Sequence, residues 1–281
     1  MTYRHLSQRA LADLADIPAQ SRWVRSGALR IHVLDYGGSG TPVVILADIT
    51  SPAVTMNFIA RELTDLVHPF VVDIRGRGLS DSGPSYSLSD YADDTDAVIA
   101  GLGLDRPVLL GHSMGARIAA ATAARRPDTV RGTILVDPPM SGPGRGRYPT
   151  PLSDFREQLE QAQRGTTADE VAQSWPRWPR REQELRARWL PSCDRNSIIR
   201  THDGFEAEDF FDTWPVVPAP TALIYGGDSP VVTPAGAKEA ATTHPAAQLI
   251  EVPGAGHMVF WDEPTAALAA LRAILRQQVR Q

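Results

Sequence analysis

The chain has little cysteine, no long apolar run and no cluster of basic residues, and each scarcity removes a class of protein. Cys193, the one cysteine among 281 residues, excludes an intramolecular disulfide and fits a reducing compartment. No apolar stretch approaches the ~20 residues of a membrane span, and the first residues lack the pattern of a signal peptide. The net charge is −5, without the basic run that a polyanion would need. We therefore expect a soluble, cytoplasmic protein that binds neither membrane nor nucleic acid; no feature indicates an oligomeric state.

Short apolar runs recur along the chain, and stretches with helical periodicity separate them. The runs are PVVILA, PFVVDI, PVLLG and GTILVD, followed much later by TALIYGG and AQLIEVPG. Near-continuous apolar runs of this length are typical of strands that are buried on both faces of a parallel sheet. A hairpin with its turn at Gly27 precedes them, and an amphipathic helix closes the chain. The sequence predicts an α/β fold with a mostly parallel, doubly covered sheet.

The alternation breaks after Asp137 and resumes near Thr221. Residues 138–220 begin with a turn-rich stretch and continue as charged helical segments. They contain four of the six tryptophans, which need a surface to bury them: Trp175, Trp178, Trp189 and Trp214. We predict a core made of residues 1–137 and 221–281, and a helical lid made of residues 138–220 over the strand ends.

A nucleophile motif lies between a predicted strand and a predicted helix. In LLGHSMGAR, Ser113 is flanked by Gly111 and Gly115, which let the chain turn sharply and expose the serine hydroxyl. His257, in the Gly-rich loop GAGHMVFWD after the last predicted strand, has the position expected of the general base. This order is that of an α/β-hydrolase, so we predict a serine nucleophile activated by His257.

Two backbone N–H groups are candidates for an oxyanion hole. Met114 follows the nucleophile, and Ile49 lies in the loop after the strand PVVILA. Many α/β-hydrolases have a His-Gly pair in that loop, where this chain has Ala47 and Asp48. Aspartate tolerates left-handed backbone better than most residues, so we expect the loop geometry to survive.

The acid of the triad has two candidates. In the usual pattern the acid stands directly before a proline, and YGGDSP puts Ser229 there, with Asp228 one residue away. The other candidate is Asp137, which ends the strand GTILVD beside the predicted nucleophile strand. Either aspartate can instead be a turn or capping residue, and the residues alone leave the choice open.

Several longer stretches resemble one family of α/β-hydrolases. DITSPAVTMNF, VVDIRGRGLSDSGP, LLGHSMGAR, LVDPPMSGPGRGRYP and GAGHMVFWD together are similar to N-formylmaleamate deformylases of bacterial nicotinate degradation. The resemblance implies a Ser113, Asp137 and His257 triad, because the family's acid lies in the LVDPP motif. It also implies hydrolysis of an N-formyl amide with release of formate, and it requires no metal or organic cofactor.

An anionic small-molecule substrate would need a cation in the pocket. Arg145 and Arg147 follow the candidate acid and are our first choice, ahead of Arg75, Arg77 and Arg117. Two other functions stay open: a carboxylesterase or C–C bond hydrolase with the same triad, and a non-catalytic receptor on the same fold.

Overall fold

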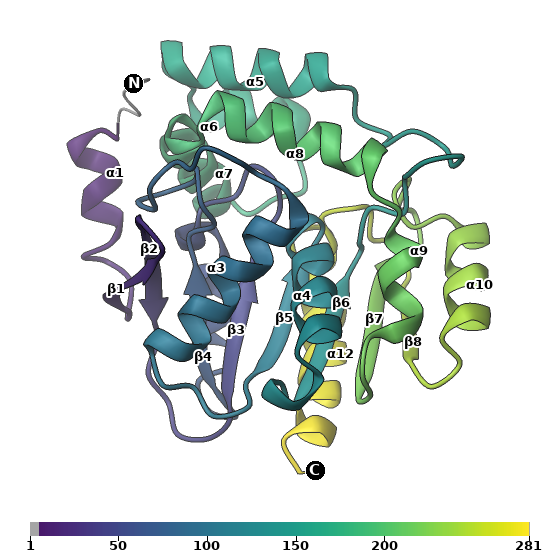
Figure 1. Ribbon diagram of the computed structural model, residues 1–281. Helices are drawn as coiled ribbons and strands as arrows, with labels where there is room; N and C mark the ends of the chain where they lie inside the picture. Colours follow the sequence, from purple (N-terminus) through teal and green to yellow (C-terminus); the bar gives the residue numbers. More distant parts are fainter. Residues whose placement is uncertain (1–5, 281) are drawn as a thin grey trace.

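One eight-stranded sheet organises the computed structural model, which describes residues 6–280 (Figure 1). Its strands lie in the order β1-β2-β4-β3-β5-β6-β7-β8. Only β2 runs against its neighbours β1 and β4; all other pairs are parallel. This confirms the predicted α/β class and the amino-terminal hairpin. The strands are β1 Gln20–Ser26, β2 Leu29–Asp35, β3 Pro42–Leu46, β4 His68–Val72, β5 Val108–His112, β6 Gly132–Val136, β7 Thr221–Gly226 and β8 Gln248–Val252.

The central strands are apolar throughout because both of their faces are covered. In β3, Val44 and Leu46 belong to one core cluster, while Val43 and Ile45 belong to the other. Successive side chains of a strand point to opposite faces, so the sheet separates the two clusters. The first cluster includes α3 (Leu88–Gly101) and α4 (Met114–Arg125); the second includes α2 (Asn57–Arg61) and α12 (Pro264–Gln278).

Residues 138–220, the segment predicted as a lid, contain helices that lie across one end of the sheet (Figure 1). These helices are α5 Leu152–Arg164, α6 Ala168–Ser174, α7 Arg180–Trp189 and α8 Arg195–Ala207; α9 Phe210–Thr213 follows them and packs beside α4. Trp178 joins them to the sheet-bearing part, because its ring stacks on Trp175 at 4.7 Å and on Trp261 at 5.4 Å between centroids. Trp178, Trp189 and Trp214 are buried.

The remaining helices are short connectors. They are α1 Gln8–Asp13, α10 Pro234–Thr243 and α11 Val259–Asp262, with 3₁₀ turns at Ala53–Met56, Pro127–Thr129, Leu190–Ser192 and Trp214–Val216. Within residues 6–280, no helix combines the length and apolarity required to cross a membrane.

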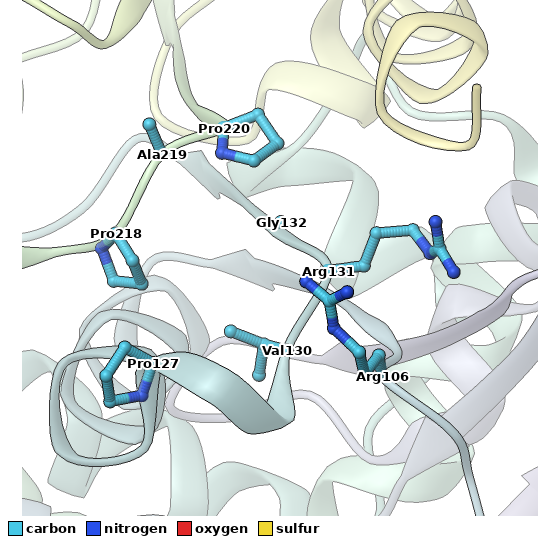
Figure 2. Close-up of a pocket in the computed structure, with 8 residues that line it drawn as sticks. All are labelled: Arg106, Pro127, Val130, Arg131, Gly132, Pro218, Ala219 and Pro220. Carbon is cyan, nitrogen blue, oxygen red and sulfur yellow. The ribbon is translucent and has the colours of Figure 1, made fainter. Parts of the chain in front are cut away.

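A cavity of about 110 Å³ opens at the amino ends of the parallel strands, as Figure 2 shows. Its wall includes Arg106 and Arg131, which precede β5 and β6, and Pro218 and Pro220, which precede β7. The predicted nucleophile and base lie after the carboxyl ends of their strands, at the other edge of the sheet. Ligands of open α/β sheets bind at the carboxyl edge, where these two residues lie.

Candidate active site

Ser113 occupies a sharp turn between β5 and α4. Its φ of 54° and ψ of −117° lie in a region that few non-glycine residues adopt. The flanking glycines are required by space: a Cβ on Gly111 would overlap Gly115, and a Cβ on Gly115 would overlap the Leu46 carbonyl. The turn places the serine hydroxyl at the carboxyl edge of the sheet, in the strand, turn and helix context predicted for a nucleophile.

The side chains of Ser113, His257 and Asp137 form one hydrogen-bonded row. His257 Nε2 lies 2.9 Å from Ser113 Oγ, and His257 Nδ1 lies 2.7 Å from Asp137 Oδ2. A carboxylate can only accept, so Nδ1–H donates to Asp137 and leaves Nε2 free to accept the serine proton. The geometry is that of a general base held in the productive tautomer.

Asp137 is fully buried and tightly bound. It follows β6 with a φ of 47°, which turns the side chain back toward the sheet edge. Oδ1 accepts a hydrogen bond from the Gly226 N–H at 3.1 Å, and Oδ2 accepts one from Ser229 Oγ at 2.6 Å. Ser229, at the usual acid position, therefore serves the carboxylate of Asp137. Asp228 is exposed, and its N–H donates to the Ala255 carbonyl at 2.9 Å.

The loop after β3 is held beside the elbow. The Gly115 N–H donates to the Ala47 carbonyl at 3.1 Å, which brings the loop next to Met114. Asp48 closes the loop on itself: its Oδ1 accepts the Thr50 N–H at 2.9 Å, and its Oδ2 accepts from the Ser51 hydroxyl. Aspartate thus replaces the usual pair with local hydrogen bonds, and the N–H groups of Ile49 and Met114 belong to adjacent, buried segments.

The Asp48 carboxylate remains ionised although it is buried. Burial raises the pKa of Asp48, but its electrostatic interactions with the neighbouring His112 and Arg186 side chains and the hydrogen bonds of the loop outweigh it, so the net shift of the pKa is downward. Burial, and then the neighbouring His257, lower the pKa of His112, which favours a neutral ring. That ring donates from Nε2 to the His257 carbonyl at 2.9 Å and so steadies the loop of the base.

A small cavity of about 60 Å³ lies beside His257, between the sheet edge and the helices of residues 138–220. Pockets for drug-sized ligands are several times larger, so the cavity fits a small substrate. One side is formed by the loops of the sheet and the other by the helical segment. Its lining comprises Asp48, Ile49, Thr50, His257 and Met258 from the first, and Tyr148, Thr150, Phe155, Gln158, Trp175, Trp178 and Arg186 from the second.

Among the lining residues that were not predicted from the sequence, Arg186 and Tyr148 bear most on the chemistry of the cavity. Arg186 on α7 is buried, and its guanidinium donates to Thr50 Oγ1 at 2.8 Å and to Gln158 Oε1 at 3.0 Å. Among residues 6–280, no carboxylate lies within ion-pair distance of it. Tyr148 places its hydroxyl 3.5 Å from His257 Nε2, and burial raises the pKa of this phenol, so it stays a neutral donor.

The arginines expected to bind an anion lie elsewhere. Arg145 pairs with Asp209 at 2.8 Å and with Glu239 at 2.8 Å, so two carboxylates already hold its guanidinium. Arg147 is exposed. Neither belongs to the described lining of the cavity beside His257, where Arg186 is the arginine present. The prediction followed adjacency to Asp137 in sequence, whereas Asp209 and Glu239 hold the guanidinium of Arg145, and Arg147 is exposed.

No group of three His, Cys, Asp or Glu side chains with the arrangement of a metal site occurs in the part of the chain from residue 6 to residue 280.

Comparison with known proteins identifies the family of the chain. The model of the alpha/beta hydrolase family matches residues 31–271. N-formylmaleamate deformylase of Pseudomonas putida is 39% identical over 249 residues, 88% of this chain and 93% of that protein. A 2-(acetamidomethylene)succinate hydrolase of Mesorhizobium japonicum is 27% identical over 272 residues, 92% of this chain and 96% of that protein. The crystal structure of an N-formylmaleamic acid deformylase from Pseudomonas putida, at 38% identity, superimposes with a TM-score of 0.85 over 90% of this chain and 100% of that one. With a family match over most of its length, the chain belongs to the alpha/beta hydrolase family and is a hydrolase.

Proposed function

We propose that this hydrolase cleaves the C–N bond of an N-formyl amide on a small carboxylate substrate, as its N-formylmaleamate deformylase relatives do. The observation that carries the proposal is the Ser113, His257 and Asp137 row beside a small cavity that contains a buried arginine. A formyl group is the smallest acyl group, and a cavity of about 60 Å³ suits it better than the long chain of a lipid ester.

In the proposed reaction, Ser113 Oγ attacks the formyl carbon while His257 Nε2 takes the hydroxyl proton. The N–H groups of Ile49 and Met114 hydrogen-bond the oxyanion of the tetrahedral intermediate. The C–N bond then breaks as His257 returns the proton to the leaving nitrogen, which gives a primary amide and a formyl-serine ester. Water, deprotonated by His257, attacks the ester; the bond to Ser113 Oγ then breaks as His257 returns the proton to that oxygen, and formate is released. Asp137 keeps His257 in the required tautomer and stabilises its cation.

Arg186 is the proposed partner of the substrate carboxylate. Its hydrogen-bond acceptors are the neutral oxygens of Thr50 and Gln158, so an incoming anion would gain a charge-assisted hydrogen bond. The carboxylate of Asp48 lies close enough to Arg186 for the charge of the guanidinium to lower the pKa of Asp48. We propose the helical segment of residues 138–220 as a lid, because it brings Arg186 and Tyr148 to the cavity and forms one of its sides.

The test is formate release from N-formylmaleamate by wild-type protein, followed with a coupled formate dehydrogenase assay. Ser113→Ala protein is the matched control, and p-nitrophenyl acetate measures the competing esterase activity. Formate release that depends on Ser113, at a kcat/KM well above that for the ester, supports the deformylase. Turnover of the ester without any formate release contradicts it and favours the carboxylesterase alternative.

A further inference from the structure

Arg77 is a fully buried arginine directly beneath the oxyanion loop. Its Nε donates to the Ile49 carbonyl at 3.0 Å. Its Nη1 donates to the Arg75 carbonyl at 2.9 Å and to Tyr91 Oη at 2.9 Å. No carboxylate lies within ion-pair distance of this guanidinium among the described residues 6–280. A buried cation is costly, so its neutral acceptors must hold it in one geometry.

The second terminal nitrogen of Arg77 reaches two further parts of the molecule. Nη2 lies 3.5 Å from Met114 Sδ, beside the nucleophile, and 2.9 Å from Thr201 Oγ1 on α8. Tyr91 Oη lies 2.6 Å from the same threonine oxygen and closes a small buried network. One guanidinium therefore touches both residues proposed to supply oxyanion donors, and it also touches a helix of the segment proposed as the lid.

The contact with Ile49 bears on the oxyanion hole through the peptide plane. The peptide that joins Ile49 to Thr50 is clamped at both ends: Arg77 binds its carbonyl, and Asp48 Oδ1 accepts its N–H at 2.9 Å. A planar peptide held at both ends cannot rotate. The preceding peptide, which carries the Ile49 N–H, is joined to this plane at the Ile49 Cα, and its own carbonyl, that of Asp48, accepts the Ser51 N–H at 3.3 Å, so contacts on both sides restrict its direction.

We propose that Arg77 is a positioning residue for the oxyanion hole, and that it makes the direction of the Ile49 N–H depend on the seating of α8. The proposal rests on the oxyanion role given to Ile49 under the proposed function, but it does not depend on which substrate is cleaved. Removal of an oxyanion donor costs about 10²–10³-fold in rate, and a misdirected donor should lose a large part of that.

The test measures the second-order rate constant for labelling of Ser113 by a fluorophosphonate, since the phosphonyl oxygen needs the same hole. We expect Arg77→Lys to slow labelling about 100-fold, because lysine cannot donate to Ile49, Tyr91 and Thr201 together. Thr201→Val, which removes only the α8 contact, should slow it about 3- to 10-fold. Millimolar guanidinium should partly restore the labelling rate of the Arg77→Ala variant, and sodium chloride at the same concentration should not.

Arg75→Lys is the matched control, since it makes the same change at a neighbouring buried arginine that pairs with Asp94 and not with the oxyanion loop. Circular dichroism establishes which variants fold. If Arg77→Lys does not fold, the labelling rate of Thr201→Val tests the proposal. Labelling within twofold of wild type by the folded variants overturns the proposal, and so does an equal loss in Arg75→Lys. The probe requires no N-formyl amide, so failure of the formate assay leaves this result interpretable.

Discussion

The exchange of Asp137 for asparagine tests the least usual feature of the site. In the wild type, this carboxylate accepts from His257 Nδ1, Ser229 Oγ and the Gly226 N–H. An amide retains only one acceptor oxygen. If that oxygen faces Gly226, the NH₂ group points at Nδ1, and the ring must accept there and carry its proton on Nε2. The Ser113 proton then has no acceptor.

The opposite orientation of the amide has its own cost. With the oxygen toward His257, the NH₂ group meets the Gly226 N–H, and a buried donor is left unsatisfied at about 1–3 kcal/mol. We expect the wrong tautomer to predominate. The corresponding change in serine proteases lowers kcat about 10⁴-fold, which is about 5.5 kcal/mol of activation free energy.

Position 229 offers a rescue. Ser229 Oγ lies 2.6 Å from Asp137 Oδ2, so a carboxylate at position 229 can lie close to the same point. In the Asp137→Asn variant, we expect the additional Ser229→Asp change to raise activity at least tenfold. In the wild-type protein, Ser229→Asp should lower activity because it crowds two carboxylates. Asp228→Asn is the control, and its exposed side chain should tolerate the change.

Steady-state kinetics on formate release, with circular dichroism to establish folding, measure all four variants. A severe loss in Asp228→Asn together with near-normal Asp137→Asn would refute the assignment. Comparable partial losses in both variants would indicate that the two carboxylates share the role.

Three further predictions concern the nucleophile and base, the anion site and a buried glutamate. Ser113→Ala and His257→Ala should each reduce kcat about 10⁴-fold or more without loss of fold; substantial turnover by folded Ser113→Ala would exclude a covalent mechanism. Arg186→Met should raise KM for the anionic substrate about 10- to 100-fold and leave kcat for a neutral ester nearly unchanged. Arg145→Ala should affect both substrates equally. The reverse pattern would assign the anion site to Arg145. Burial raises the pKa of Glu182 to about 7, above its unfolded value, so the stability of the fold falls as pH rises from about 4.5 to 7. Glu182→Gln should therefore raise the free energy of unfolding at pH 8 by about 1–3 kcal/mol and flatten this pH dependence in thermal melts. An unchanged pH profile of the variant contradicts the shift.

The sheet and the elbow could be predicted from sequence because local rules determine them. Apolar runs such as those of β3 and β5 fit only strands with two covered faces, and Gly111 and Gly115 leave room where any Cβ would overlap backbone. The choice between Asp137 and Asp228 needed more than the residues. Both follow strands, and their difference is orientation: the first turns inward at a φ of 47°, and the second faces solvent.

Arg186 could not be predicted in the same way because its burial is a tertiary effect. The helix α7 has arginines on several faces, and Arg188 pairs with Asp13 while Arg186 reaches Thr50 in a distant loop. Glu182 and Arg186 are both buried on a helix with few apolar residues. The spacing of apolar residues in α7 therefore does not indicate which face of the helix lines the cavity.

The position of Asp137, the proposed acid, follows from the register of the sheet. His112 of β5 pairs with Val136 of β6, so Ser113 and Asp137 each come one residue after paired positions on adjacent strands. The Ser113 N–H donates to the Val136 carbonyl at 2.8 Å, and the Asp137 N–H donates to the Ile224 carbonyl at 2.9 Å, which ties nucleophile and acid into one continuous ladder. An acid after β7 would be one strand further away and would reach His257 from the turn at Ser229. In this chain, Ser229 in that turn donates its hydroxyl to the Asp137 carboxylate, which follows β6. The Asp137 oxygen that His257 Nδ1 contacts therefore lies close to the point that an acid at position 229 would occupy. We therefore expect an acid on either strand to hold His257 in place, which is the basis of the rescue predicted for Ser229→Asp.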